Sequence, residues 1–197
     1  MSRAECMKIE KKIAFHSAPS LLGVKCANLV ALNHSESDIK SYAELFNCKG
    51  RKYDLQFRIL CSCKERTLIL IYNEKLLENR LNNKRIQHFL HSYGYHMNCS
   101  LHYYLKKLSE RISCYDEFPH EIGAFLDYPY EDIVGFIANK GKNFKICGCW
   151  KVYGDTATAK RTFSNYDKCR NYLCYKLNSG IDIFNAIQEG YLSCKQQ

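Results

Sequence analysis

The sequence predicts a mixed α and β protein, of α/β or α+β class, with a small mixed sheet of about four strands covered by eight or nine helices. Three observations predict it. Segments 53–60 and 66–72 have the composition of neighbouring strands. Most of the remaining chain repeats apolar residues with the helical period. The order of these elements is not a regular βαβ alternation, which favours a mixed sheet over a parallel one.

The N-terminal part is expected to alternate between helix and strand. Residues 3–15 carry an apolar helical stripe, Pro19 breaks the pattern, and 27–32 has the pattern of a short strand. Ser35 is the candidate N-cap of a helix that ends near Asn47.

The two central strands differ in their patterns. In 53–60, every second residue is apolar, which predicts one buried face. Segment 66–72 contains TLILIY, which is apolar on both faces and suits a central strand. Residues 61–65 would form the hairpin connection.

The rest of the chain is predicted to be helical, with one more strand at 144–153. Residues suited to start or cap a helix precede four of these segments: Ser100, Pro119, Pro129 and Asp155. Glycines suited to end a helix follow three of them: Gly94, Gly141 and Gly180. A long apolar stripe follows Asp155: Ala159, Phe163, Tyr166, Cys169, Leu173 and Leu177. A final helix is expected over 181–189.

Composition bounds the class of protein. A length of 197 residues fits a single domain over 1–197. The N-terminus is charged, without the apolar core of a signal peptide, and no apolar run could span a bilayer. We therefore expect a cytoplasmic protein whose twelve cysteines stay mostly free and buried. A net charge of +9 allows an acidic partner, although the basic residues are dispersed.

Four segments resemble a known family: FHSAPSLLGVKCANLVAL at 15–32, EFPHEIGAFLDYPYEDIVGFIANKG at 117–141, CGCWKVYGD at 147–155 and YDKCRNYL at 166–173. They are similar, in the same order, to the DUF3793 family of bacterial proteins, found mainly in clostridia and related Firmicutes. The resemblance implies one cytosolic domain. It supplies no reaction, because the family has no assigned activity.

Two groups of polar residues next to turns are candidate anion-binding sites. His16, Lys25 and Asn28 surround the turn at Pro19 and could bind a carboxylate or phosphate. The alternative is a capping arrangement that holds the N-terminal helix against strand 27–32. His120 and Glu121 lie at a helix start, where an anion is favoured and a histidine could act as acid or base. The alternative is that Glu121 only offsets the helix dipole.

The WKVYGD segment is the third candidate. In a strand, Trp150 and Val152 share one face, while Lys151 and Tyr153 share the other. We expect Trp150 in the core, which leaves Lys151 and Tyr153 exposed together to meet a ligand. The alternative is an aromatic core anchor followed by a capping Asp155.

Metal and cofactor signals are weak. Cys61 and Cys63, and Cys147 and Cys149, form two CxC pairs that could converge on zinc or an iron–sulfur cluster. CxC is a weaker signal than paired CxxC, so we expect no bound zinc or iron. No P-loop, dinucleotide, zincin or hydrolase motif occurs, and the cofactor is therefore unknown.

Three functions compete. The first is a small-ligand protein, either a binding protein or an enzyme of unassigned reaction, for which an anion is one option as ligand. We expect its pocket where His16, Lys25, His120 and Trp150 meet. The second is a nucleic-acid-binding module, suggested by the charge and 15 tyrosines, with weak and non-specific binding expected because no reading motif is present. The third is a metal or redox accessory protein.

Overall fold

A computed structural model describes residues 3–33, 36–62, 66–114 and 118–194 of the chain. The described chain forms two compact units, which we treat separately: unit 1 comprises 1–74 with 166–197, and unit 2 comprises 75–165. The expectation of a single domain therefore stays a prediction. In the described part of the chain, no helix combines the length and apolar character needed to cross a membrane.

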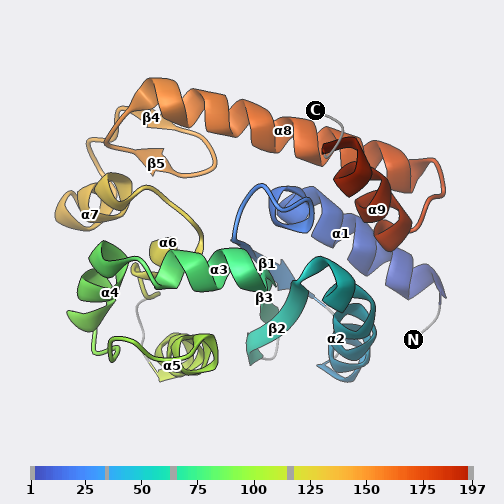
Figure 1. The fold of residues 1–197 in the computed structure, drawn as a ribbon, viewed down its shortest axis with the longest axis horizontal. Helices are drawn as coiled ribbons and strands as arrows, with labels where there is room; N and C mark the ends of the chain where they lie inside the picture. Colours follow the sequence, from blue (N-terminus) through green and yellow to red (C-terminus); the bar gives the residue numbers. More distant parts are fainter. Residues whose placement is uncertain (1–2, 34–35, 63–65, 115–117, 195–197) are drawn as a thin grey trace. The chain divides into compact units, whose positions relative to one another are not determined.

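Unit 1 is a three-stranded sheet with helices packed against it (Figure 1). Its elements, in chain order, are α1 (Arg3–Leu21), β1 (Ala27–Leu32), α2 (Glu36–Gly50), the 3₁₀ turn η1 (Arg51–Tyr53), β2 (Leu55–Ser62), β3 (Thr67–Asn73), the second part of α8 (Thr156–Asn178) and α9 (Ile183–Cys194). The predicted N-cap Ser35 lies outside the described residues.

The sheet has the order β1-β3-β2, with all neighbours antiparallel. The central place of β3 confirms the reading of TLILIY, while the expectation of a mixed, four-stranded sheet was wrong. Strand β2 begins at Leu55 because Tyr53 lies in η1. A bulge between Ile59 and Cys61 then shifts the register, and Leu60 is buried although the alternating pattern places it outward.

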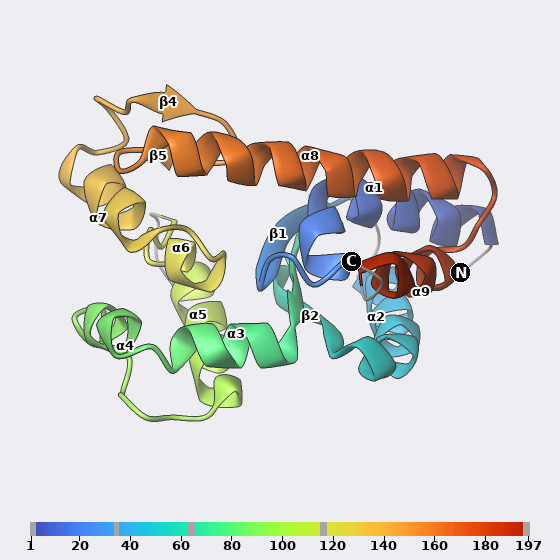
Figure 2. The same cartoon turned by 45° about the horizontal axis from the view of Figure 1, so that its top comes forward.

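Helices α1, α2 and α9 lie on the same side of the sheet in both Figure 1 and Figure 2. The apolar residues of these elements form one buried cluster with the facing strand residues. Members of the cluster include Ile13 of α1, Phe46 of α2, Phe57 of β2, Ile71 of β3 and Ile187 of α9. Burial of this apolar surface is the main stabilising term for unit 1.

The prediction that Pro19 ends the first helix was wrong, because α1 continues to Leu21. Proline has no N–H to donate, which would leave the carbonyl of Phe15, one turn earlier, without its helical partner. Arg170 supplies the missing donor: its Nε donates to the Phe15 oxygen at 3.1 Å, and its guanidinium lies 5.1 Å from the Phe15 ring. A side chain from α8 thus satisfies the backbone group that proline leaves open.

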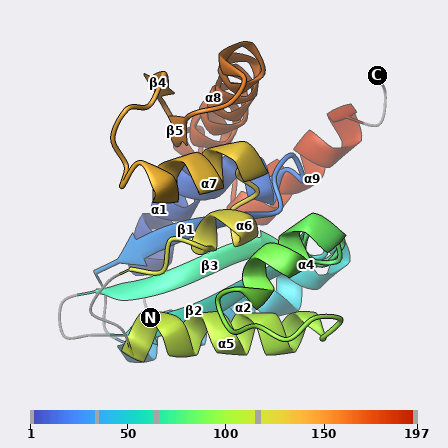
Figure 3. The same ribbon diagram turned by 90° about the vertical axis from the view of Figure 1, so that its left-hand side faces the viewer.

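Unit 2 consists of short helices and one small hairpin, seen from the side in Figure 3. Its elements are α3 (Glu74–Leu81, starting at the last residue of unit 1), α4 (Lys84–His91), α5 (Leu101–Cys114), α6 (Ile122–Phe125), α7 (Tyr130–Ala138), β4 (Ile146–Cys147), β5 (Lys151–Val152) and the first part of α8. Figure 1 shows the hairpin beside the first turns of α8.

The predicted strand 144–153 is instead this hairpin, in which β4 pairs antiparallel with β5. The chain reverses at Gly148, whose N–H donates to the Trp150 oxygen at 3.0 Å. A Cβ at Gly148 would overlap the ring of Phe163, so only glycine allows the turn to approach α8 this closely. Apolar patterning did not reveal this turn.

The helix boundaries largely follow the predicted capping residues. Asp155 Oδ1 accepts hydrogen bonds from the first turn of α8, and Ser100 Oγ accepts one from Tyr103 N at the start of α5. The predicted stop glycines all have positive φ: Gly94, Gly141 and Gly180. The final helix begins two residues later than predicted, at Ile183, because Asp182 caps it.

Candidate functional site

A pocket of about 240 Å³ lies in unit 2, between the start of α7, the end of the β4–β5 hairpin and the first turns of α8. Its wall includes three carboxyl residues, Glu131, Asp132 and Asp155. Trp150 and the threonines of α8, Thr158 and Thr162, supply aromatic and hydroxyl surface. The WKVYGD segment therefore contributes to this pocket through its first residue and its last two.

Asp132 organises the pocket. It is only 3 % exposed, and both carboxylate oxygens accept hydrogen bonds. Oδ2 accepts from the indole Nε1 of Trp150 at 2.6 Å, and Oδ1 accepts from the backbone N–H groups of Tyr153 and Gly154, each at 2.7 Å. Three donors compensate for burial of the charge. They also fix the chain after β5 to the first turn of α7.

Trp150 lies in the core, as predicted, with an exposed fraction of 8 %. Its ring is stacked with Tyr128 at 5.2 Å between centroids, and Phe163 meets it edge-on at 4.5 Å. The ring is thus held on two sides by aromatic contacts and at Nε1 by Asp132. Because Trp150 also borders the pocket, it forms a fixed aromatic part of the wall.

Asp155 has two roles, as N-cap of α8 and as part of the pocket wall. Its Oδ2 accepts from Thr158 Oγ1 at 2.5 Å, and its Oδ1 accepts from the N–H groups of Ala157 and Thr158. These hydrogen bonds, the one from the Thr158 hydroxyl foremost, lower the pKa of Asp155. The carboxylate therefore stays charged at neutral pH.

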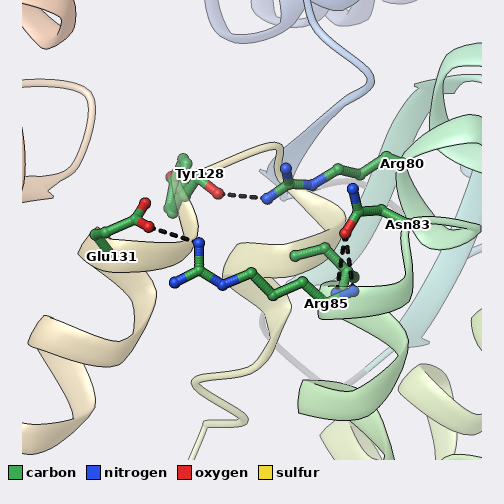
Figure 4. A network of polar contacts seen from close by, with 6 residues as sticks. Arg80, Asn83, Arg85, Tyr128 and Glu131 are labelled. Carbon is green, nitrogen blue, oxygen red and sulfur yellow. Dashed lines mark hydrogen bonds and ion pairs between the residues drawn. The ribbon is translucent and has the colours of Figure 1, made fainter.

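Glu131 is joined to a neighbouring helix, as Figure 4 shows. Arg85 of α4 donates from Nη1 to Glu131 Oε1 at 2.7 Å, and its guanidinium lies 3.8 Å from the ring centroid of Tyr130. Asn83 starts α4 by accepting from the N–H of Arg85. A hydrogen bond from its own backbone N–H, followed by the contact with Arg85, lowers the pKa of Glu131.

A second arginine supports the turn beneath Trp150. Arg80 of α3 donates from Nη2 to the backbone oxygen of Tyr128 at 2.5 Å (Figure 4) and from Nε to that of Ala124 at 3.3 Å. Ala124 lies in the last turn of α6, and Tyr128 lies in the turn before Pro129. Carbonyl groups at a helix end have no N–H partner within the helix, so Arg80 supplies the missing donors. The turn that carries the stacking partner of Trp150 is therefore fixed to α3.

The predicted residues His16, Lys25 and Asn28 lie in unit 1. His16 is exposed, although part of its side chain is covered by neighbouring atoms. Desolvation of that part, followed by the positive charges of Lys12 and Arg170, lowers the pKa of His16. Lys25 is buried, with Nζ 5.5 Å from the ring centroid of Tyr166.

Asn28 connects two elements. Its Oδ1 accepts from Ser20 Oγ at 2.7 Å, which links β1 to the end of α1. This contact is the helix-to-strand arrangement that the sequence offered as the alternative to a binding role.

Glu121 is the N-cap residue of α6, but its side chain makes no capping hydrogen bond and points into the interior of unit 2. It is buried and accepts from Arg111 Nε in an ion pair and from Tyr95 OH at 3.4 Å. His120, the adjacent residue, is exposed, with its ring 5.2 Å from that of Phe136. The two side chains thus have separate surroundings.

Lys151 and Tyr153 share a target, as their place on one strand face predicts. Lys151 Nζ donates to the backbone oxygen of Gly141 at 2.7 Å, and Tyr153 OH donates to that of Lys142 at 2.9 Å. Both side chains therefore hold the loop after α7. Neither lines the pocket.

The predicted common cleft stays a prediction, because His16 and Lys25 belong to unit 1 while His120 and Trp150 belong to unit 2. Within unit 2, His120 and Lys151 both lie near the ring of Phe136. Sequence reasoning missed Glu131, Asp132, Thr158 and Thr162. The available signal was the pair of carboxyl residues, Glu131 and Asp132, in the first turn after Pro129 of an otherwise apolar helix.

The two CxC pairs are separated between the units, with Cys61 in unit 1 and Cys147 and Cys149 in unit 2. Cys63 lies outside the described residues. Among the residues that are described, no group of three or more histidine, cysteine or carboxyl residues is placed to hold a metal ion. Absence of bound zinc or iron stays a prediction.

The family model of DUF3793, a protein family of unknown function, matches residues 13–187. The match covers most of the chain and all residues of the pocket. The chain therefore belongs to the DUF3793 family. No curated protein matches the chain, and no solved structure does either.

Proposed function

We propose that this member of the DUF3793 family binds a small ligand in the pocket between α7, the β4–β5 hairpin and α8. The observation that carries the proposal is a concave site whose aromatic and polar groups are already held in place by hydrogen bonds. Such preorganisation lowers the entropic cost of binding. A volume of about 240 Å³ is below the range of roughly 300–1,000 Å³ of drug-sized ligands, so we infer a small metabolite.

The lining favours a cationic ligand in this pocket. Glu131 and Asp155 have lowered pKa values and remain charged at neutral pH. None of the described lining residues is basic. Carboxylates beside the ring of Trp150 suit an ammonium group, through charge and through cation–π contact, and the threonine hydroxyls suit a polar substituent. The anionic ligand expected from the sequence rests on His16, Lys25 and His120, which lie outside this pocket.

We propose binding rather than a reaction because the carboxyl groups are not poised for proton transfer. A general acid or base works best with a pKa near the operating pH. Glu131 and Asp155 are shifted in the opposite direction, and Asp132 is occupied by three donors. A cytoplasmic location is part of the proposal, supported by the nine cysteines whose side chains are described as free thiols.

The chain contains one tryptophan, so its fluorescence reports on the pocket wall directly. We expect ethanolamine and choline to change the emission of Trp150 in a saturable manner at neutral pH, and acetate and glycerol to leave it unchanged. The matched variants are Thr162→Arg, which places a cation in the pocket, and Ser164→Arg on an exposed position of the same helix.

Loss of the cation response in Thr162→Arg with retention in Ser164→Arg supports the proposal. An equal response to acetate, or no saturable response to any cation, contradicts it. Circular dichroism of both variants establishes that they fold.

A further inference from the structure

The loop after α7, residues 139–145, concentrates positive charge around one aromatic ring. Lys140, Lys142 and Lys145 are exposed there, and Phe144 lies between the last two with 40 % of its surface open. The chain has no carboxyl residue from 133 to 154. This loop is therefore a local cationic surface, distinct from the acidic pocket, and the ligand proposed above does not account for it.

Hydrogen bonds from the hairpin hold the loop in one conformation. Lys151 and Tyr153 donate to the carbonyls of Gly141 and Lys142, and Lys145 Nζ donates to the oxygen of Gly154 at 2.8 Å. The backbone is left-handed at Gly141 and at its neighbours Lys140 and Asn143. A loop fixed by three side-chain contacts pays little additional conformational entropy when a partner binds.

The aromatic ring is supported from within. Lys151 Nζ lies 5.1 Å from the ring centroid of Phe144 and 5.7 Å from that of Phe136. Phe144 therefore has a fixed neighbour in Lys151, while 40 % of its surface is exposed. A side chain that enters a bilayer needs apolar neighbours, whereas Phe144 has Asn143 and Lys145 beside it.

We propose that this loop binds single-stranded nucleic acid, with one base stacked on Phe144 and phosphates contacted by Lys140 and Lys142. Proteins that bind single strands of any sequence combine aromatic rings, on which bases stack, with cations that contact the phosphates. Stacking tolerates any sequence because every base has a flat face. A duplex keeps its base faces covered, so the loop selects unpaired strands. Neither Lys140 nor Lys142 forms an ion pair with another described residue, which leaves both charges for phosphates.

The test is fluorescence anisotropy of a labelled oligothymidine of about fifteen nucleotides, within the range of known single-strand site sizes. Phe144→Ala is expected to weaken binding about 5- to 100-fold with little change in salt dependence. The double variant Lys140→Ala with Lys142→Ala is expected to reduce the slope of log affinity against log salt by about 1.4, since each lost phosphate contact removes about 0.7.

The matched controls lie in unit 1: Tyr175→Ala, whose ring is 70 % exposed, and the double variant Lys8→Ala with Lys11→Ala on α1. Both should bind like the unchanged protein. Phe144→Tyr should keep the affinity, which separates stacking from a structural effect.

Equal losses in the controls, or a duplex bound as tightly as the single strand, would overturn the proposal. Tighter binding to vesicles of anionic lipid, lost in Phe144→Ala, would also overturn it and assign the loop to a membrane surface.

Discussion

Unit 1 buries an apolar cluster that reaches from Ile9 to Ile187, whereas unit 2 buries two carboxylates, Asp132 and Glu121, among its aromatic side chains. Apolar contacts have no direction, so the cluster specifies little beyond volume and pattern. The buried carboxylates accept from named donors at fixed angles, so they specify which segment meets which. The pocket is found in the unit that is organised in this second way.

Unit 2 holds its candidate site in place without a large sheet. In unit 2, the hairpin has only two residues in each strand, too few to be stable by pairing alone. Its position depends on Asp132 and on the aromatic contacts of Trp150. We therefore expect single polar changes in unit 2 to have larger effects than similar apolar changes in unit 1.

The largest effect is expected for Asp132→Ala. The substitution leaves the indole of Trp150 and the N–H groups of Tyr153 and Gly154 without their acceptor. Each buried donor that loses its acceptor costs about 1–3 kcal/mol, so we expect a loss of roughly 3 kcal/mol or more for the three together. Urea unfolding followed by Trp150 emission measures the change, with Asp167→Ala, at an exposed position of α8, as the control. Equal losses of stability in the two variants would show that Asp132 does not hold the hairpin in place.

One replacement in each unit compares the stability lost with a polar contact and with an apolar contact. Trp150→Phe keeps an aromatic ring but removes the donor to Asp132, and we expect a loss of about 1.5–3 kcal/mol. Phe46→Leu in unit 1 removes a ring that contacts Tyr42, Phe57 and Phe184 but removes no hydrogen bond, and we expect about 1 kcal/mol. Thermal unfolding by circular dichroism compares both. A larger loss of stability for Phe46→Leu than for Trp150→Phe would contradict the expectation that single polar contacts in unit 2 matter more than apolar contacts in unit 1.

Tyr42→Phe is expected to have almost no effect or to stabilise slightly. The Tyr42 hydroxyl is buried in unit 1 without a hydrogen-bond partner among the described residues. Removing an unsatisfied buried hydroxyl releases a desolvation penalty of up to about 1 kcal/mol. Denaturant unfolding of the variant measures this. A loss above about 1 kcal/mol would show that the hydroxyl has a partner in the folded protein.

The smallest effect concerns pH. Partial burial, followed by the charge of Asp182, raises the pKa of Glu10 in the folded chain. Because the folded state then holds the proton more tightly than the unfolded state, stability falls as pH rises from the ordinary pKa through the raised one. Glu10→Gln removes this contribution. The difference in Tm between the variant and the unchanged protein should therefore grow in favour of the variant between pH 4 and pH 7.

Parts of the fold could be predicted because they depend on local patterns. The TLILIY segment identified the central strand, and Asp155, Gly141 and Gly180 marked helix ends by their own backbone demands. The continuation of α1 through Pro19 could not be predicted, because it depends on Arg170, distant in the sequence. Long-range hydrogen bonds of this kind leave no periodic signal.

The candidate site was predicted only through Trp150, which was expected to border a cleft, while Asp155 was expected only as the cap of the following helix. Asp132 lay in a segment that looked like an ordinary helix start, and its donors come from residues about twenty positions further along the chain. Lys151 and Tyr153 were correctly placed together, yet they hold a loop and do not line the pocket. The sequence predicted which residue types were important and which strand face they share, but it did not predict their hydrogen-bond partners in distant segments.

Hydrogen exchange followed by NMR measures the role of Asp132 at single protons, because three N–H groups donate hydrogen bonds to its carboxylate. In the unchanged protein, the indole Nε1–H of Trp150 and the amides of Tyr153 and Gly154 should exchange slowly. In Asp132→Ala, these three should accelerate together, while the amides of Ile69 and Ile71 in β3 keep their rates. Fast exchange of the three protons in the unchanged protein, or equal acceleration in β3, would contradict the account.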